Sequence, residues 1–184
     1  MLYPQIDIES ISNIGERLVA EALSSYCPKE WVIIYSKYWL WKYLKYNCHH
    51  FKEGEIDFVV VVPNKGFVVL EVKSAKNYRL TDRGIWQRFD TSSAKWIDYS
   101  KSPWEQASSN KHALVSILAE RCSCKRLGCG YGAAVVFPRC RMEGKLPAGE
   151  DDSAMIINAN DLERIEDIIK GILDGWWQGA GNTD

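Results

Sequence analysis

The sequence predicts a single α/β domain, in which short valine-rich strands are combined with amphipathic helices. Residues 56–62 and 67–72 are two apolar runs joined by the turn-forming residues Pro63, Asn64 and Gly66, which predicts a hairpin covered on both faces. No repeat or low-complexity linker divides the 184 residues. We therefore expect one domain over residues 1–184, with its core at about 10–174 and a loose tail over 175–184.

The remaining elements follow from periodicity and from start signals. Apolar residues recur at helical spacing after Ser10 and Ser12, either of which can cap the first helix. Pro103 suits the first turn of a second helix, and Asn160-Asp161 can cap the last one. In chain order we expect a helix over 10–25, a strand over 31–35, the hairpin over 56–72, an exposed hairpin over 77–89, a helix over 103–121, strands over 131–137 and 154–157, and a final helix.

Composition and the N-terminal residues favour a cytoplasmic protein. The hydrophobic content of 46% and the charged content of 26% are those of an ordinary globular domain. No run approaches the roughly 18 apolar residues of a membrane span. The first residues lack the basic flank and apolar stretch of a signal peptide, so we expect no association with a membrane.

Basic and aromatic residues are concentrated in the middle of the chain. Residues 73–145 hold fourteen Lys/Arg against six Asp/Glu. Such a segment can follow a phosphate backbone, or it can be a solvated surface. Aromatic residues alternate with lysines over residues 35–46. This pattern favours a buried strand or a homodimer interface, with stacking on unpaired bases as the alternative.

Four of the six cysteines lie close together in the sequence, at Cys122, Cys124, Cys129 and Cys140. Their density could support zinc or an iron–sulfur cluster, but their spacing departs from the usual paired C-x2-C arrangement. We therefore expect reduced thiols here, with a cysteine-bound metal as the weaker alternative.

Asp57, Glu71 and Lys73 are the strongest candidates for chemistry. Charged groups at the ends of buried strands are costly unless they are paired or bind an ion. Asp57 and Glu71 could share Mg²⁺, which Mn²⁺ could replace, with the backbone carbonyl of Val72 as a further ligand. Lys73 could then orient or deprotonate the water that attacks a phosphodiester.

The geometry of the hairpin decides whether these groups meet. Alternation places Glu71 and Lys73 on one face of their strand. Asp57 joins them if the hairpin has an odd number of loop residues, such as Pro63–Lys65, with Gly66 suited to a left-handed position or a bulge. A two- or four-residue loop without a bulge would place Asp57 on the opposite face.

An ordered set of short motifs surrounds these residues. Gly15-Glu16, Glu55-Ile56-Asp57, Leu70-Glu71-Val72-Lys73 and Pro103-Trp104-Glu105-Gln106, followed by the apolar strand 133–137, occur in this order. The set resembles the nuclease-related domain (NERD) family of the PD-(D/E)xK nuclease superfamily. The resemblance covers roughly residues 10–140.

The resemblance implies a restriction-endonuclease-like αβββαβ core with a mixed central sheet flanked by helices, and Mg²⁺-dependent cleavage of DNA, with RNA left open. It makes Asp57 and Glu71 metal ligands and Lys73 the catalytic lysine. Glu16 becomes a further acidic residue that reaches the metal directly or through water, and Gln106 a polar group beside Lys73.

Two further expectations concern partners and activity. Modules of this family often accompany helicase, kinase or DNA-binding domains. The sequence contains none, so we expect a separately encoded helicase or other DNA-processing partner. The alternative to a nuclease is a non-catalytic module of the same fold that binds nucleic acid or supports assembly.

Overall fold

The computed structural model describes residues 2–35, 56–140 and 156–180. Its elements, in order, are β1 (Leu2–Tyr3), η1 (Ile8–Ser10), α1 (Ile14–Tyr26), β2 (Val32–Tyr35), β3 (Phe58–Val62), β4 (Gly66–Val72), β5 (Tyr78–Leu80), β6 (Trp86–Asp90), β7 (Lys95–Asp98), α3 (Pro103–Arg121), β8 (Gly130–Phe137), β9 (Ile156–Asn158), η3 (Ala159–Arg164) and α4 (Ile165–Ala180).

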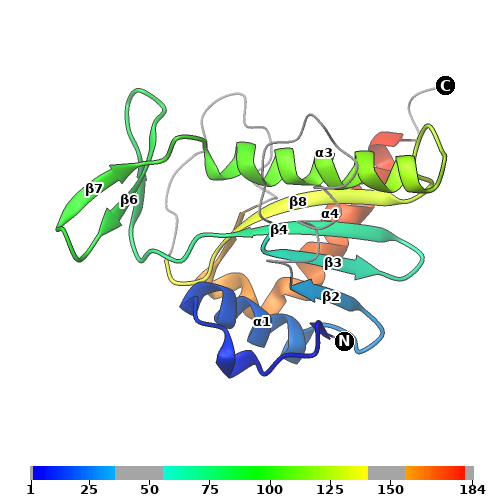
Figure 1. The fold of residues 1–184 in the computed structure, drawn as a ribbon, viewed down its shortest axis with the longest axis horizontal. Coiled ribbons are helices and arrows are strands. Elements are labelled where there is room, and N and C mark those ends of the chain that lie inside the picture. The colour runs from blue at the N-terminus through cyan, green and yellow to red at the C-terminus, as the bar shows by residue number, and fades with distance from the viewer. Residues whose placement is uncertain (1, 36–55, 141–155, 181–184) are drawn as a thin grey trace.

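A mixed sheet forms the centre of the molecule (Figure 1). Within the described residues it has six strands in the order β1-β2-β3-β4-β8-β9. Strands β2, β3 and β4 are antiparallel, whereas β8 and β9 continue the sheet in parallel with β4. The order α1-β2-β3-β4-α3-β8 confirms the predicted αβββαβ core, into which β5, β6 and β7 are inserted.

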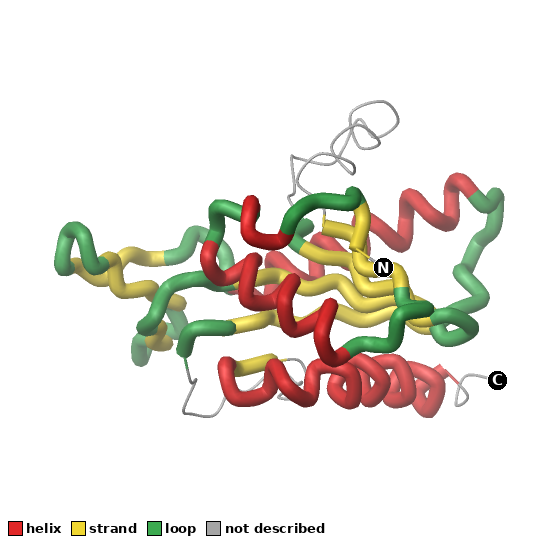
Figure 2. The backbone as a smooth tube through the Cα atoms, turned by 90° about the horizontal axis from the view of Figure 1, so that it is seen from below, coloured by secondary structure: helices red, strands yellow, loops and turns green. Residues whose placement is uncertain are grey.

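Helices cover both faces of this sheet. Helix α3 packs on one face against β4 and β8, while α1 and α4 lie on the other face (Figures 1 and 2). The valines of β3 and β4 alternate between the two cores: Val60 and Val68 pack towards α1 and α4, and Val59 and Val69 pack towards α3. Burial on both faces explains why these strands are almost continuously apolar.

The β3–β4 hairpin has the odd loop on which the predicted site depends. Phe58 pairs with Leu70 and Val62 with Gly66, so residues 63–65 form a three-residue loop. Continuing this register by one pair places Asp57 opposite Glu71. The left-handed loop residue is Asn64, at φ 60°, and Gly66 has a φ of 146°. The register is confirmed, and Asn64 shares with Gly66 the positive φ that was expected of the glycine.

Gly66 is required where β4 meets β8. A Cβ built on Gly66 would overlap the backbone carbonyl oxygen of Gly130, its partner in the parallel ladder. We expect Gly66→Ala to lower the free energy of unfolding by about 2 kcal/mol or more, because both the backbone conformation and the strand pairing must change. Urea unfolding will measure the loss. Gly128→Ala is the control: a Cβ there meets no atom within 4 Å, and an equal loss in both variants would contradict this role.

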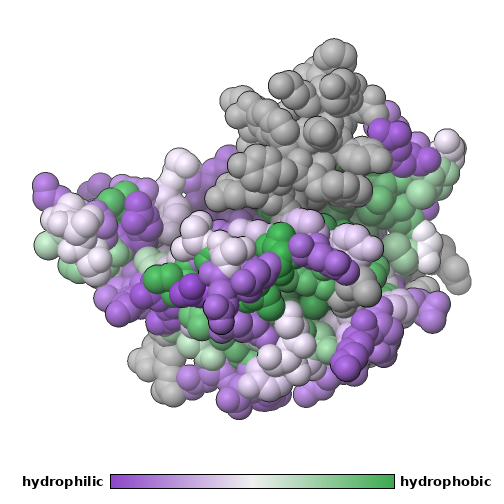
Figure 3. Space-filling model, turned by 60° about the horizontal axis from the view of Figure 1, so that its bottom comes forward, coloured by the Kyte–Doolittle hydropathy of each residue, from purple (hydrophilic) through white to green (hydrophobic). Residues whose placement is uncertain are grey.

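A second, three-stranded antiparallel sheet projects from the core (Figure 1). Strands β5 and β6 confirm the hairpin predicted over residues 77–89, and Arg79 pairs with Gln87. Strand β7 was not predicted. It pairs with β6 after a turn in which Asp90 accepts hydrogen bonds from the Ser92 and Ser93 hydroxyls. On the face shown in Figure 3, this sheet carries mostly hydrophilic or intermediate residues.

Helix boundaries differ from the predictions at three places. The N-cap of α1 is Asn13, and neither Ser10 nor Ser12 fills this role, because the Asn13 side chain accepts from the backbone of Gly15. The 3₁₀ helix η3 precedes α4, so residues 160–161 do not cap it. Helix α4 continues to Ala180, beyond the predicted end of the core at about residue 174.

The aromatic segment over residues 35–46 lies almost wholly outside the residues that the structure describes. Of the aromatic segment 35–46, only Tyr35 lies within the described residues, where it ends β2 and packs against Phe58 with ring centroids 5.2 Å apart.

In the described part of the chain, every helix is too short or too polar to cross a bilayer.

Candidate functional site

Asp57 lies beside the carboxyl end of β4, close to Glu71 in this strand and to Lys73, which directly follows it. Asp57 directly precedes β3, and its Oδ2 atom accepts a hydrogen bond of 2.7 Å from the backbone N–H of Val72. This bond continues the pairing of the hairpin beyond its last regular pair. The odd loop therefore places the Asp57 carboxylate at the strand end where the sequence predicted it.

Helix α3 holds both charged side chains of β4. The Lys73 Nζ atom donates to Glu71 Oε1 at 2.8 Å and to Gln106 Oε1 at 2.9 Å. One turn further along α3, the Asn110 amide donates to the other Glu71 oxygen at 3.2 Å. Glu71, Lys73 and Asn110 are all buried. Such a network fixes the rotamers of the acid and the lysine before any ligand binds.

The start of α3 fixes the position of this network. Ser102 and Glu105 form a reciprocal capping box, in which each side chain bonds to the other residue's backbone N–H at 3.0 Å. Pro103 follows as the first helical residue. Because the helix begins at a defined residue, Gln106 and Asn110 point from the same side of α3 towards β4.

Glu16 approaches the site from α1, on the other face of the sheet. It is 5% exposed. Its Oε1 atom accepts from the Asn13 amide and its Oε2 atom from the Tyr35 hydroxyl, both at 2.6 Å. Both carboxylate oxygens are thus already hydrogen-bonded within the protein. The two Glu71 oxygens are hydrogen-bonded as well, so the difference between the acids is their place: Glu16 reaches the site from the opposite face of the sheet, which favours contact with a bound cation through water.

The carboxylates of Asp57, Glu71 and Glu16 lie close enough for the charges of the two glutamates to act on Asp57. Burial and the negative charges of Glu71 and Glu16 raise the pKa of Asp57 to about 8, against the opposing effects of the Val72 N–H and Lys73. A carboxyl group in this environment gains most from a cation, which reverses the effect of the neighbouring charges. The site is thus short of positive charge, although it contains a lysine.

The donor set fits a hard divalent cation better than a transition metal. Asp57 and Glu71 offer carboxylate oxygens on adjacent strands, and Mg²⁺ is commonly bound through one or two carboxylates with water completing its shell. The described residues contain no group of three or more His, Cys, Asp or Glu side chains arranged to hold a metal ion. Asp57 and Glu71, which face each other at the ends of β3 and β4, are the two side chains that would ligate the cation directly.

The four cysteines do not form one cluster. Cys129 precedes β8 and Cys140 follows it, at opposite ends of a strand of eight residues. At about 3.3 Å per residue the strand separates them by more than 20 Å. Cys122 and Cys124 lie near Cys129, because their charges contribute with burial to raising its pKa. The three nearby thiols lie far from Asp57 along the sheet.

Sequence reasoning did not identify four residues that support the site. Asn110 carries a usable signal, because it lies four residues after Gln106 on a helix. Asn13 caps the helix that carries Glu16 and lies three residues before it, a spacing that the sequence does show. Tyr35 comes from a separate strand and carries no such signal. Tyr99 is the fourth, and its ring lies with its centroid 5.3 Å from the Lys73 ammonium.

Gly15 allows α1 to approach the end of β4 closely. A Cβ at this position would overlap the Ser74 side chain and lie 3.0 Å from its Cα. We expect Gly15→Ala to displace Glu16 and to lower any activity of the site by about tenfold, with a loss of about 1–3 kcal/mol in unfolding free energy. Adding Ser74→Gly should restore part of both losses in a double-mutant cycle. Strictly additive losses would contradict this contact.

The mixed sheet, the helices on both of its faces and the acid–lysine pair at the end of β4 define a restriction-endonuclease-like α/β domain. The family model described as nuclease-related domain (NERD) matches residues 11–138, which is more than half of the chain. The chain therefore belongs to the nuclease-related domain family. Comparisons with curated proteins and with solved structures found no match.

Proposed function

We propose that the protein is an Mg²⁺-dependent deoxyribonuclease, with endonuclease activity favoured over exonuclease activity. The observation that carries this proposal is the position of Lys73, whose ammonium lies between Glu71 and Gln106 on a strand end shared with Asp57. Membership of a nuclease-related family supports the same reaction class. The basic middle segment supports a polyanionic substrate.

Each residue has a role that follows from its contacts. Asp57 and Glu71 bind the cation, with the Val72 carbonyl as a further oxygen donor. When bound, Mg²⁺ would polarise the phosphodiester and lower the pKa of the attacking water. Lys73 orients that water and stabilises the negative charge that develops on the phosphate.

Three positioning residues support these groups. Gln106 accepts a hydrogen bond of 2.9 Å from the Lys73 ammonium and so shares this cation with Glu71, which Lys73 contacts at 2.8 Å. Asn110 holds the Glu71 oxygen that Lys73 does not contact. Glu16, which reaches the site from the opposite face of the sheet, acts through an ordered water.

A cleavage panel tests the proposed function. Supercoiled plasmid, linear duplex, single-stranded DNA, branched DNA and RNA are incubated with the purified protein, with Mg²⁺ or with a chelator. We expect cleavage of DNA only with the cation, and nicking of the plasmid, because a closed circle offers no end to an exonuclease. Binding without any metal-dependent product would instead identify a non-catalytic module.

A further inference from the structure

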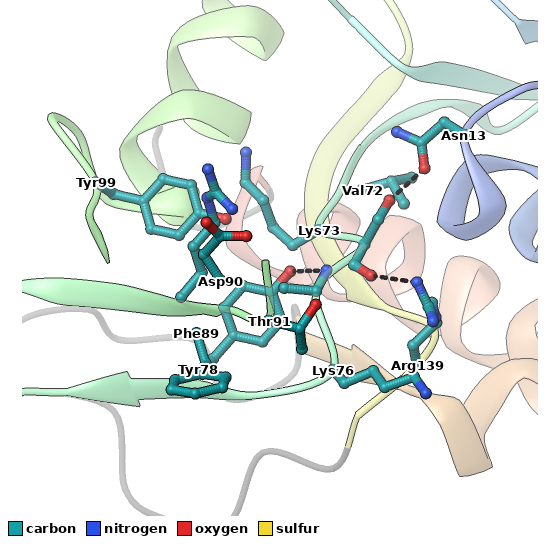
Figure 4. Close-up of a pocket in the computed structure, with 13 residues that line it drawn as sticks. Asn13, Val72, Lys73, Lys76, Tyr78, Phe89, Asp90, Thr91, Tyr99 and Arg139 are labelled. Atoms are coloured by element: carbon teal, nitrogen blue, oxygen red, sulfur yellow. Dashed lines mark hydrogen bonds between the residues drawn. The ribbon is translucent and has the colours of Figure 1, made fainter. Parts of the chain in front are cut away.

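A pocket of about 560 Å³ opens directly beside Lys73 (Figure 4). It is formed by Val72 and Lys73 at the end of β4, by the turn that follows, and by the inner side of the projecting β5–β7 sheet. Its volume lies within the range of small-molecule and nucleotide sites. Because Lys73 belongs to both the pocket and the candidate active site, a ligand in the pocket would lie next to the reacting phosphate.

The pocket has an excess of positive charge. Lys76 and Arg88 line it, and within the described residues the side chain of neither makes a hydrogen bond or an ion pair. Arg139 also lines it and donates to the backbone carbonyl of Ser74 at 3.1 Å. Asp90 is the one carboxylate among the lining residues, and it accepts hydrogen bonds from Ser92 and Ser93. Two cations thus remain available for an anionic ligand.

Aromatic side chains form a rigid wall of the same pocket. The Tyr78 hydroxyl accepts from the backbone N–H of Ala75 at 2.6 Å, which ties β5 to the turn after β4. The Tyr78 ring packs edge-on against Phe137 at 4.8 Å and lies nearly parallel to Tyr99, with centroids 6.4 Å apart. Cations beside fixed aromatic rings are typical of sites that bind unpaired nucleotides.

We propose that this pocket holds an unpaired nucleotide next to the scissile phosphate, so that the preferred substrate is single-stranded or locally unpaired DNA. Lys76 and Arg88 bind the phosphate of this nucleotide, and its base lies against the aromatic wall. A base of a fully paired duplex can enter such a pocket only after it is unstacked and unpaired, which costs about a few kcal/mol that an unpaired nucleotide does not require. The inference rests on the proposed nuclease function, because it assigns the strand structure of that substrate.

Binding in the presence of a chelator tests the pocket independently of catalysis. The probes are a fluorescent oligothymidylate, a blunt duplex of equal length, and an oligonucleotide of equal length whose central residues are abasic. We expect the single strand to bind about tenfold more tightly than the duplex. The abasic strand should bind at least about fivefold more weakly than the intact one, because it retains the phosphates but offers no base to stack.

The variant is Lys76→Gln with Arg88→Gln. It should weaken binding of the single strand about tenfold and reduce the magnitude of the slope of log K against log salt by about 0.7, because the two cations together neutralise one phosphate. The matched control is Arg121→Gln with Lys125→Gln, which removes the same charge from exposed positions at and beyond the end of α3. An unchanged affinity in the first variant, or an equal loss in both, overturns the proposal.

Cleavage with Mg²⁺ then separates this inference from the proposed function. If the protein prefers single strands through Lys76 and Arg88 but cleaves no DNA, the proposed nucleotide pocket is supported and the proposed nuclease function is rejected. Cleavage that is equally fast on paired and unpaired DNA, and unchanged in the pocket variant, retains the nuclease and removes the pocket.

Discussion

Replacing Lys73 with glutamine will lower Mg²⁺-dependent DNA cleavage by at least about 10³-fold, because the substitution removes the positive charge that faces the developing charge on the phosphate. Glutamine is the informative replacement, since its amide can still donate to Glu71. Alanine would leave a buried carboxylate without its cation, which destabilises a fold by about 3–5 kcal/mol. Single-turnover cleavage with saturating Mg²⁺ measures the effect.

The control for this substitution is Lys65→Gln. Lys65 lies in the β3–β4 loop and makes an exposed ion pair with Asp174 at 2.5 Å, and such surface pairs contribute about 0–1 kcal/mol. We expect near-normal cleavage by this control, and in Lys73→Gln a cooperative thermal unfolding transition with a lowered midpoint, because Glu71 keeps a hydrogen bond but loses its buried cation. Lys73→Gln activity within tenfold of the wild type would show that the lysine has no part in the chemistry.

Asp57→Asn will stabilise the protein in the presence of a chelator at pH 8. The pKa of Asp57 is about 8 in the folded protein and 3.8 when unperturbed, so the folded state binds the proton more tightly. The contribution of this carboxyl group to the free energy of unfolding is then largest below pH 4, and it falls by up to about 1.4 kcal/mol per pH unit as the pH rises towards 8. Asparagine can keep the hydrogen bond from Val72 without a charge, and it should raise the unfolding free energy at pH 8 by at least about 1 kcal/mol.

Urea unfolding of both proteins at pH 5 and pH 8, in chelator and in Mg²⁺, measures this effect. The wild type should lose stability relative to Asp57→Asn between pH 5 and pH 8. Added Mg²⁺ should restore stability to the wild type alone, by preferential binding to its folded state. If the free energies of unfolding of the two proteins changed with pH in the same way, the surroundings of Asp57 would not raise its pKa.

The central hairpin was predictable because two local signals agree. Valine-rich runs define the strands, and the turn residues between them allow the odd loop that places Asp57 opposite Glu71. The structure confirms this register through the Val62–Gly66 pair. Gly66 was expected at a left-handed position or at a bulge. It has a positive φ, which Asn64 shares, and a Cβ on Gly66 would also overlap the carbonyl oxygen of Gly130.

The surroundings of the site depend on contacts that the sequence does not encode locally. Tyr35 reaches Glu16 across nineteen positions and Asn110 reaches Glu71 across thirty-nine. The pocket combines residues as distant as Asn13 and Arg139. Strand β7 was missed because its short exposed segment has no apolar alternation to distinguish it from a loop.

The location of a divalent cation tests the central claim most directly. A crystal of the protein grown with Mn²⁺ is measured at a wavelength where manganese scatters anomalously. We expect one strong peak between the Asp57 and Glu71 carboxylates and near the Val72 carbonyl, and no peak there in a crystal of Asp57→Asn. A fully formed site without such a peak, or a peak only at the cysteines near the start of β8, would contradict the claim that this strand end binds the catalytic metal.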